Sequence, residues 1–266
     1  MIGLLSPAGR DALAGLLRAR PLLGFDFDGT LAPIRPRPDQ VWMDARPAAA
    51  FAELARRLPV AVVTGRGVAD VRPRLAGTPR WVIGNHGAEG MPDADPARLA
   101  AQAAVCAGWH AKLGGVNAAL GDGVVLEDKR YTLCLHYRQA PDHEAARRAL
   151  AARVASLQPA PEVVGGKCVF NLLPAGSVDK FGALRELARR MGTENVFFIG
   201  DDENDELVFR RAPPSWVTVK VGADGPSAAR FGVPDQASVA DCLELMLALS
   251  GEGLRDRPAL QPAPFA

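Results

Sequence analysis

The sequence has 266 residues, of which 48% are hydrophobic, so it can bury one large core or two smaller ones. Its net charge is +1, with basic residues scattered among acidic ones, which argues against a nucleic-acid-binding surface. The sequence contains no apolar run of membrane-spanning length, and residues 1–7 lack the basic start of a signal peptide. We therefore expect a cytoplasmic protein with neither membrane nor nucleic-acid partners.

The first predicted strand, Leu22 to Phe27, is an apolar run that leads two aspartates into an Asp-Gly-Thr turn. Side chains two apart on a strand share a face, so we expect Asp26 and Asp28 to converge on one ligand. Two carboxylates this close repel each other, and a hard divalent cation such as Mg²⁺ would keep both ionised. The stretch indicates a phosphoryl-transfer site. The alternative is a plain turn in which Asp28 caps the segment that follows.

A second predicted strand, Pro59 to Val63, ends in Thr64, Gly65 and Arg66, where a helix is expected to begin. Thr64 would offer its hydroxyl group to a phosphoryl oxygen, and the neighbouring residues would offer their backbone N–H groups. A threonine at this position is also typical of an ordinary helix N-cap.

A third predicted strand, Trp81 to Gly84, is followed by far more chain than the next helix and strand of a doubly wound sheet require. We expect core segments at residues 1–88 and 174–252, with an inserted domain at residues 89–173. The elements expected inside it are a helix from Pro96 to Leu113, strands from Val124 to Asp128 and from Thr132 to Tyr137, a helix from Asp142 to Leu157, and strands around Val163 and from Val169 to Leu172. This αββαββ order predicts an antiparallel sheet backed by helices.

Lys180 is expected to begin an amphipathic helix, where its charge opposes the helix dipole and calls for an anionic partner. The predicted strand Val196 to Ile199 then leads into residues 201–206, of which five are acidic and would repel one another without a cation. We expect Asp205 to contact Lys180 or a metal-bound water, or alternatively to stabilise the helix N-terminus, and Asp202 to support the same site.

These motifs occur in an order that resembles the haloacid dehalogenase superfamily of aspartate-nucleophile phosphohydrolases, over nearly the whole chain. The resemblance implies an α/β fold, with a doubly wound, mostly parallel sheet and an inserted α+β cap domain. It implies that Asp26 is the nucleophile and Asp28 the general acid and base, while Thr64 and Lys180 hold the phosphoryl group. Asp26, Asp201 and the carbonyl of Asp28 would then bind Mg²⁺.

The inserted segment resembles that of trehalose-6-phosphate phosphatases, through Glu127-Asp128-Lys129, His136-Tyr137-Arg138 and Gly166-Lys167, with Gly-Asn-His-Gly-Ala-Glu at 84–89 before it. The resemblance implies a cap that closes over the substrate. The substrate-binding residues expected on this basis are Gly65, Arg66, His86, Glu127, Lys129, Arg138, Lys167 and Asn171. From the pattern alone, the polar residues of the cap would instead belong to a solvated sheet face.

Asn171 departs from that family, which has glutamate four residues after the Gly-Lys pair. Charge-assisted hydrogen bonds contribute roughly 1.5–3 kcal/mol against about 1 for neutral ones, so asparagine would weaken sugar binding by one or two powers of ten. We expect Mg²⁺-dependent hydrolysis of trehalose 6-phosphate. The alternatives are hydrolysis of another sugar phosphate, such as a glycosyl phosphoglycerate, a phosphomutase, and a sugar-phosphate-binding regulator without turnover.

The remaining features carry little functional information. The cysteines, Cys106, Cys134, Cys168 and Cys242, lack metal-ligand spacing and are expected to be reduced core residues. The proline-rich segment 253–266 is expected to be a flexible tail. The oligomeric state stays open.

Overall fold

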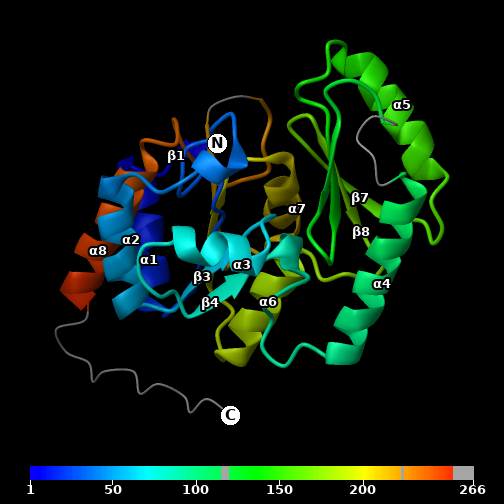
Figure 1. Cartoon of the computed structure of the whole chain (residues 1–266). Coiled ribbons are helices and arrows are strands. Elements are labelled where there is room, and N and C mark those ends of the chain that lie inside the picture. Colours follow the sequence, from blue (N-terminus) through cyan, green and yellow to red (C-terminus); the bar gives the residue numbers. More distant parts are fainter. Residues whose placement is uncertain (115–119, 223–224, 254–266) are drawn as a thin grey trace.

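The computed structural model describes residues 1–114, 120–222 and 225–253, and it contains two β-sheets (Figure 1). The larger sheet has seven strands in the order β1-β11-β10-β9-β2-β3-β4, and all neighbouring strands are parallel. Its strands are β1 Ile2–Gly3, β2 Leu22–Phe25, β3 Val60–Val63, β4 Trp81–Ile83, β9 Val196–Gly200, β10 Val217–Val221 and β11 Phe231–Val233. The expected tail, beyond residue 253, lies outside the described residues.

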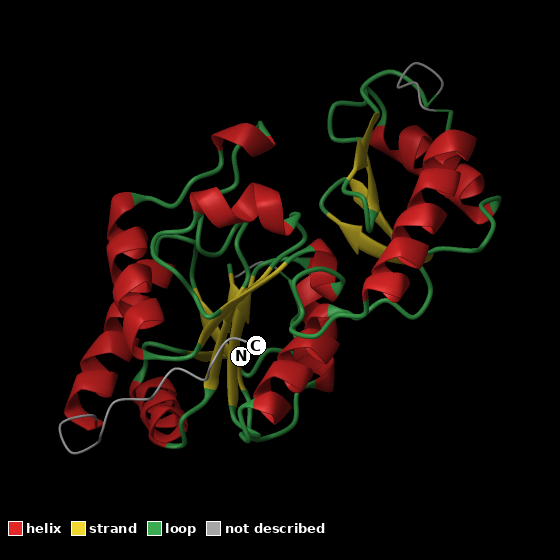
Figure 2. Ribbon diagram, turned by 60° about the horizontal axis from the view of Figure 1, so that its bottom comes forward, coloured by secondary structure: helices red, strands yellow, loops and turns green. Residues whose placement is uncertain are grey.

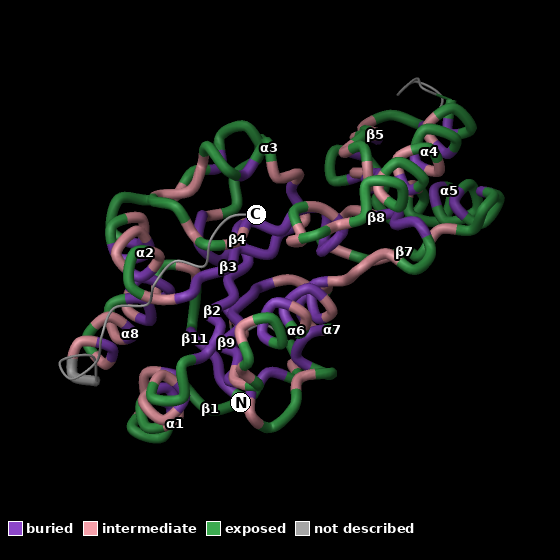
Figure 3. The backbone as a smooth tube through the Cα atoms, turned by 90° about the horizontal axis from the view of Figure 1, so that it is seen from below, coloured by how far each residue is buried: buried purple, intermediate pink, exposed green. Residues whose placement is uncertain are grey.

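Helices cover both faces of this sheet, because alternate strand residues are apolar on each side. One face packs against α1 Pro7–Arg18, α2 Ala45–Arg57 and α8 Val239–Gly253, and the other against α6 Lys180–Arg190 and α7 Glu203–Arg211. In β2, for example, Leu23 and Phe25 belong to the first layer and Leu22 to the second. The central strands are therefore buried on both sides (Figure 3).

The smaller sheet is antiparallel, in the order β5-β6-β8-β7, and confirms the expected αββαββ arrangement. Its elements are α4 Pro96–Lys112, β5 Val125–Asp128, β6 Leu133–His136, α5 His143–Ala155, β7 Glu162–Gly166 and β8 Val169–Leu173. The two helices cover its outer face around Trp109 and Leu150, and the other face looks toward the larger sheet (Figure 2). The inserted α+β cap is thus present, while its limits at residues 89 and 173 remain a proposal.

Connections at the carboxyl edge of the larger sheet place several predicted residues close together. Strand β2 pairs with β3 on one side and β9 on the other, so the chain order reverses beside it. Ligands of open α/β sheets bind at such a switch point. Short helices complete this edge, namely η1 Pro38–Gln40, α3 Val68–Val71, η2 Arg72–Arg74 and η3 Asn85–Gly87. No helix within the described ranges is both long and apolar enough to cross a bilayer.

Candidate active site

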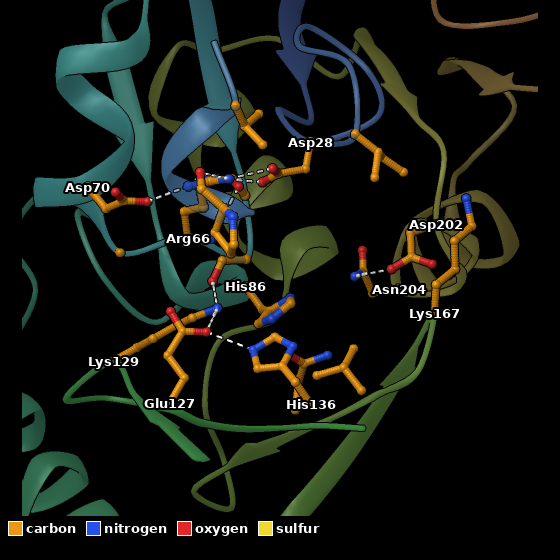
Figure 4. A pocket seen from close by; sticks show the side chains of 18 of the residues that line it. Asp28, Arg66, Asp70, His86, Glu127, Lys129, His136, Lys167, Asp202 and Asn204 are labelled. Atoms are coloured by element: carbon orange, nitrogen blue, oxygen red, sulfur yellow. Dashed lines mark hydrogen bonds and ion pairs between the residues drawn. The ribbon is translucent and has the colours of Figure 1, made fainter. Parts of the chain in front are cut away.

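A cavity of about 870 Å³ lies between the carboxyl edge of the larger sheet and the cap (Figure 4). It is lined by every residue that the sequence singled out for the site except Asp205. These lining residues are Asp26, Asp28, Thr64, Gly65, Arg66, His86, Glu127, Lys129, Arg138, Lys167, Asn171, Lys180, Asp201 and Asp202. Residues far apart in sequence are therefore gathered in one space of the size that small-molecule sites have.

Lys180 occupies the first turn of α6, where Asp179 caps the helix by accepting a hydrogen bond from the backbone N–H of Gly182. Its buried ammonium donates to Asp26 Oδ1 at 2.9 Å and to Asp205 Oδ1 at 2.7 Å. Burial lowers the pKa of Lys180, but the Asp205 and Asp26 carboxylates outweigh it, so the net shift is upward. These two carboxylates are the anionic partners that a lysine at a helix N-terminus requires.

Asp26, Asp201 and Asp205 form an acidic cluster whose oxygens lie within 4.8 Å of one another. Burial raises the pKa of Asp26, with further upward shifts from Asp205 and Asp201 against the opposing effect of Lys180. Burial and the Asp205 charge raise the pKa of Asp201 to about 6. Asp205 also accepts from the backbone N–H of Asp202 at 3.0 Å, so it both caps α7 and binds Lys180.

One oxygen of the cluster has the environment of a cation ligand. Asp201 Oδ1 is buried and has no hydrogen-bond partner among the described residues. Gly29, at φ +76°, allows this close approach, since a Cβ there would lie 2.3 Å from the Asp201 carboxylate. Because both Asp205 oxygens are already hydrogen-bonded, Asp26 and Asp201 remain as carboxylate donors, and such oxygen donors fit a hard divalent cation.

Asp28 lines the same cavity as Asp26, but its carboxylate is not part of the acidic cluster that contains Asp26. Strand β2 ends at Phe25, and the chain then leaves the sheet, so the alternation of side chains no longer applies. The Asp28 carboxylate accepts two hydrogen bonds from Arg66, at 2.8 and 2.7 Å, and lies outside the acidic cluster. Arg66 is thus engaged with a protein carboxylate at the point where substrate contact was expected.

Thr64, Gly65 and His86 form the wall next to Lys180. Thr64 follows β3, and its hydroxyl accepts from the backbone N–H of Arg66 at 3.2 Å. Only glycine fits at position 65, because a Cβ would lie 2.6 Å from the His86 ring. Neither ring nitrogen of His86 makes a hydrogen bond of good geometry within the described chain. Burial, with the nearby lysine charges, lowers the pKa of His86 to about 3, so the ring is neutral.

The cap presents an acidic and a basic side chain side by side. Glu127 lies 2.8 Å from His136 Nε2 and 3.5 Å from the Lys129 ammonium. Burial raises the pKa of Glu127, but these partners outweigh it and bring it down to about 2. Sequence patterns did not indicate the pairing of His136 with Glu127, although their strands are neighbours in the sheet.

Several contacts join the cap to the core across the cavity. The Lys129 ammonium donates to the Gly65 carbonyl at 3.1 Å, and that of Lys167 lies 3.3 Å from Asp201 Oδ2. Thr132 donates to the Asn85 side chain at 2.7 Å, a bridge that no sequence pattern indicated. The cap therefore lies against the carboxyl edge of the larger sheet in this structure.

Asn171 lines the cavity, but its amide is used within the cap sheet. It donates to the Val164 carbonyl at 3.1 Å and accepts from Cys134 Sγ at 3.1 Å. Arg138 donates to the backbone carbonyl of Lys167 at 3.2 Å, which supports the β7–β8 turn. Cys134 is a buried thiol, as are Cys106 and Cys242, whereas Cys168 is only partly buried, contrary to expectation.

Comparisons with known proteins agree with this architecture. Residues 24–231 match the family model described as trehalose-phosphatase. The trehalose-phosphate phosphatase of Mycobacterium avium is 35% identical over 89% of this chain and 63% of its own length, and that of Mycobacterium tuberculosis is 34% identical over 85% and 61%. The chain thus spans less than two thirds of the length of these relatives.

Solved structures share the fold at lower identity. A trehalose-6-phosphate phosphatase related protein has a TM-score of 0.73 at 23% identity, covering 87% of this chain and 99% of that one. The C-terminal domain of the Candida albicans trehalose-6-phosphate phosphatase has a TM-score of 0.67 at 18% identity, covering 91% and 96%. At these identities both similarities concern the fold alone.

Proposed function

The chain belongs to the trehalose-phosphatase family, and we propose that it hydrolyses trehalose 6-phosphate to trehalose and inorganic phosphate. The observation that carries this proposal is the buried Asp26–Lys180 pair in a cavity whose opposite wall comes from the cap. A carboxylate next to a fixed ammonium offers a nucleophile together with a cation for the phosphoryl oxygens. The names of the relatives support the choice of trehalose 6-phosphate.

In this mechanism Asp26 attacks phosphorus and forms an aspartyl phosphate while the bond to the sugar oxygen breaks. Asp28 gives a proton to that oxygen and later removes one from the water that attacks the intermediate, which releases phosphate and regenerates Asp26. Lys180 and the Thr64 hydroxyl bind the phosphoryl oxygens throughout. Asp26, Asp201 and the Asp28 carbonyl would hold Mg²⁺, which supplies positive charge to the phosphoryl group when bound.

The cap supplies recognition of the sugar. Lys129, Lys167 and Arg138 would add positive charge against the phosphate dianion, and Glu127 would accept hydrogen bonds from sugar hydroxyls. Closure of residues 89–173 over the core would exclude water from the intermediate. The short cap-to-core contacts of Lys129 and Lys167 support a closed arrangement of this kind.

A second candidate is the same hydrolysis of another sugar phosphate, such as a glycosyl phosphoglycerate. Asn171 favours this candidate. Its amide is hydrogen-bonded to Val164 and Cys134, and it offers no charged acceptor to the sugar. A site without that carboxylate would discriminate less strongly among sugars.

Phosphate release from a panel of sugar phosphates, with Mg²⁺ and with a chelator, tests the proposal. We expect kcat/KM for trehalose 6-phosphate to exceed that for glucose 6-phosphate and p-nitrophenyl phosphate by about tenfold or more, since uniform binding of phosphate alone cannot discriminate. The chelator should abolish turnover. Comparable rates on all three esters would refute the proposed specificity.

A further inference from the structure

Four side chains of alternating charge, each bonded to the next, lie along one wall of the cavity, namely Asp28, Arg66, Asp70 and Arg74, which we call the charge chain. Arg66 donates to Asp28 and, through Nη1, to Asp70 Oδ2 at 2.7 Å (Figure 4). Arg74 donates to Asp70 Oδ1 at 2.8 and 3.2 Å. Asp70 lies in α3 and Arg74 four residues later in η2, whereas Arg66 lies in the bend just before α3.

Arg66, in the middle of the charge chain, is held by several contacts. The Arg66 side chain is only 9% exposed and lies over the ring of Phe27, with its guanidinium carbon 5.7 Å from the ring centre. Besides Asp28 and Asp70, it donates to the Pro38 carbonyl at 3.1 Å. Burial raises the pKa of Asp70, but Arg66 and Arg74 outweigh it, so that carboxyl stays ionised.

Arg74, at the far end of the charge chain, contacts the loop around η1. Arg74 donates to the backbone carbonyls of Asp39 and Val41, each at 3.1 Å. Its guanidinium carbon also lies 5.1 Å from the ring centre of Trp42. Arg74 is 12% exposed, so these contacts leave it little freedom to move.

We propose that Asp70 and Arg74 are positioning residues that fix Arg66 and thereby hold Asp28 where it transfers a proton to the leaving sugar oxygen. The inference rests on the role proposed above for Asp28. The Asp28 side chain is 39% exposed in the cavity, and both of its oxygens bond to Arg66, so its orientation depends on that guanidinium. Proton transfer is sensitive to errors of well under 1 Å, which makes such support effective.

Two esters with different leaving groups separate this role from a general structural one. The alkoxide of trehalose 6-phosphate needs a proton as it leaves, whereas p-nitrophenolate departs without one. The value of kcat/KM reports the steps up to departure of that group. For Asp70→Asn we expect kcat/KM to fall about tenfold on trehalose 6-phosphate and less than about threefold on p-nitrophenyl phosphate.

Arg74→Gln is a second variant, which leaves the Arg66–Asp70 pair intact and should show the same asymmetry in weaker form. Asp70→Glu should restore part of the loss, and Arg72→Ala, at an exposed arginine of the same segment, should leave both esters unchanged. Equal losses on both esters, or no loss in Asp70→Asn, would overturn the proposal. If the wild type prefers another alkyl phosphate, the proposed substrate is wrong, and the asymmetry is then measured on that ester.

Discussion

Lys180 shows how one side chain can organise a site that is otherwise composed of like charges. Its ammonium is buried between Asp26 and Asp205, which would repel each other without it. The sequence indicated that this lysine needs an anionic partner, and the contact with Asp205 was among those expected. The contact with Asp26 was not foreseen.

Replacing this cation should affect stability as well as turnover. In Lys180→Met the two carboxylates stay buried without compensation, and we expect a loss of about 3–5 kcal/mol in the free energy of unfolding, together with loss of phosphate release. Chemical denaturation at pH 7 measures the first effect. Arg98→Met, at an exposed arginine of α4, is the control and should change stability by less than about 0.5 kcal/mol. A Lys180→Met variant as stable as the control would contradict the assigned burial of charge.

His86 should make stability depend on pH in a predictable direction. Its pKa is about 3 in the folded chain and about 6.5 when unfolded, so the unfolded state binds the proton more readily. Its contribution is complete above about pH 6.5 and is lost as pH falls toward 3, which amounts to roughly 2–3 kcal/mol at pH 4.5.

The test compares the free energy of unfolding at pH 7.5 and 4.5 for the wild type, His86→Gln and His143→Gln, an exposed histidine. Removal of His86 should reduce the decrease in the free energy of unfolding between pH 7.5 and 4.5, whereas the His143 variant should show the same decrease as the wild type. An identical decrease in all three proteins would show that His86 does not have the lowered pKa assigned to it.

The strands that precede the site motifs and the elements of the cap were predictable from their apolar patterns, whereas no prediction was made for α1, α2, β10, β11 and α8. The strand runs before Asp26, Thr64 and Asp201, and the αββαββ order of the cap, follow from periodicity alone. The ends of elements were less predictable. Strand β2 stops at Phe25, and the chain then turns through local backbone hydrogen bonds to the Phe27 carbonyl. The side chain of Asp28 in this turn is bonded to Arg66, 38 positions away, which no local pattern encodes.

The β7–β8 turn also depends on a neighbour distant in sequence, Asp202, and this contact gives a prediction. A Cβ on Gly166 would lie 2.8 Å from Val169 Cγ1 and 3.1 Å from Asp202 Oδ2, so Gly166→Ala should push this turn away from the core. We expect kcat/KM on trehalose 6-phosphate to fall about tenfold through misplacement of Lys167, with a minor change in melting temperature. Gly108→Ala is the control, because a Cβ there meets no described atom within 4 Å. Unchanged kinetics in Gly166→Ala would argue against a close fit of this turn to the core during turnover.

Considered as a whole, the molecule brings two separately packed units together around one cavity, and the proposed mechanism assigns the chemistry to the core and recognition to the cap. Sequence motifs predicted residues on both units, yet they could not show that Lys129 and Lys167 of the cap reach Gly65 and Asp201 of the core. Such contacts depend on how two separately packed units meet.

Metal binding offers a test of the assembled site. Mg²⁺ should stabilise the wild type by about 2.7 kcal/mol at a concentration 100 times its Kd, because it binds only the folded acidic cluster. Asp201→Asn should lose this response and, without metal, should be more stable than the wild type, since it removes one of the buried like charges. Melting curves at increasing Mg²⁺ measure both effects, and an undiminished response in the variant would exclude Asp201 as a ligand.

The most direct measurement is phosphate release from trehalose 6-phosphate by the wild type and by Asp26→Asn, assayed side by side with Mg²⁺. The asparagine keeps an oxygen that can accept from Lys180 but cannot form the aspartyl phosphate, so we expect kcat to fall by about a thousandfold or more. Mass spectrometry of the variant guards against deamidation back to aspartate. A variant of confirmed mass that retains more than about a tenth of wild-type turnover would contradict nucleophilic catalysis by Asp26.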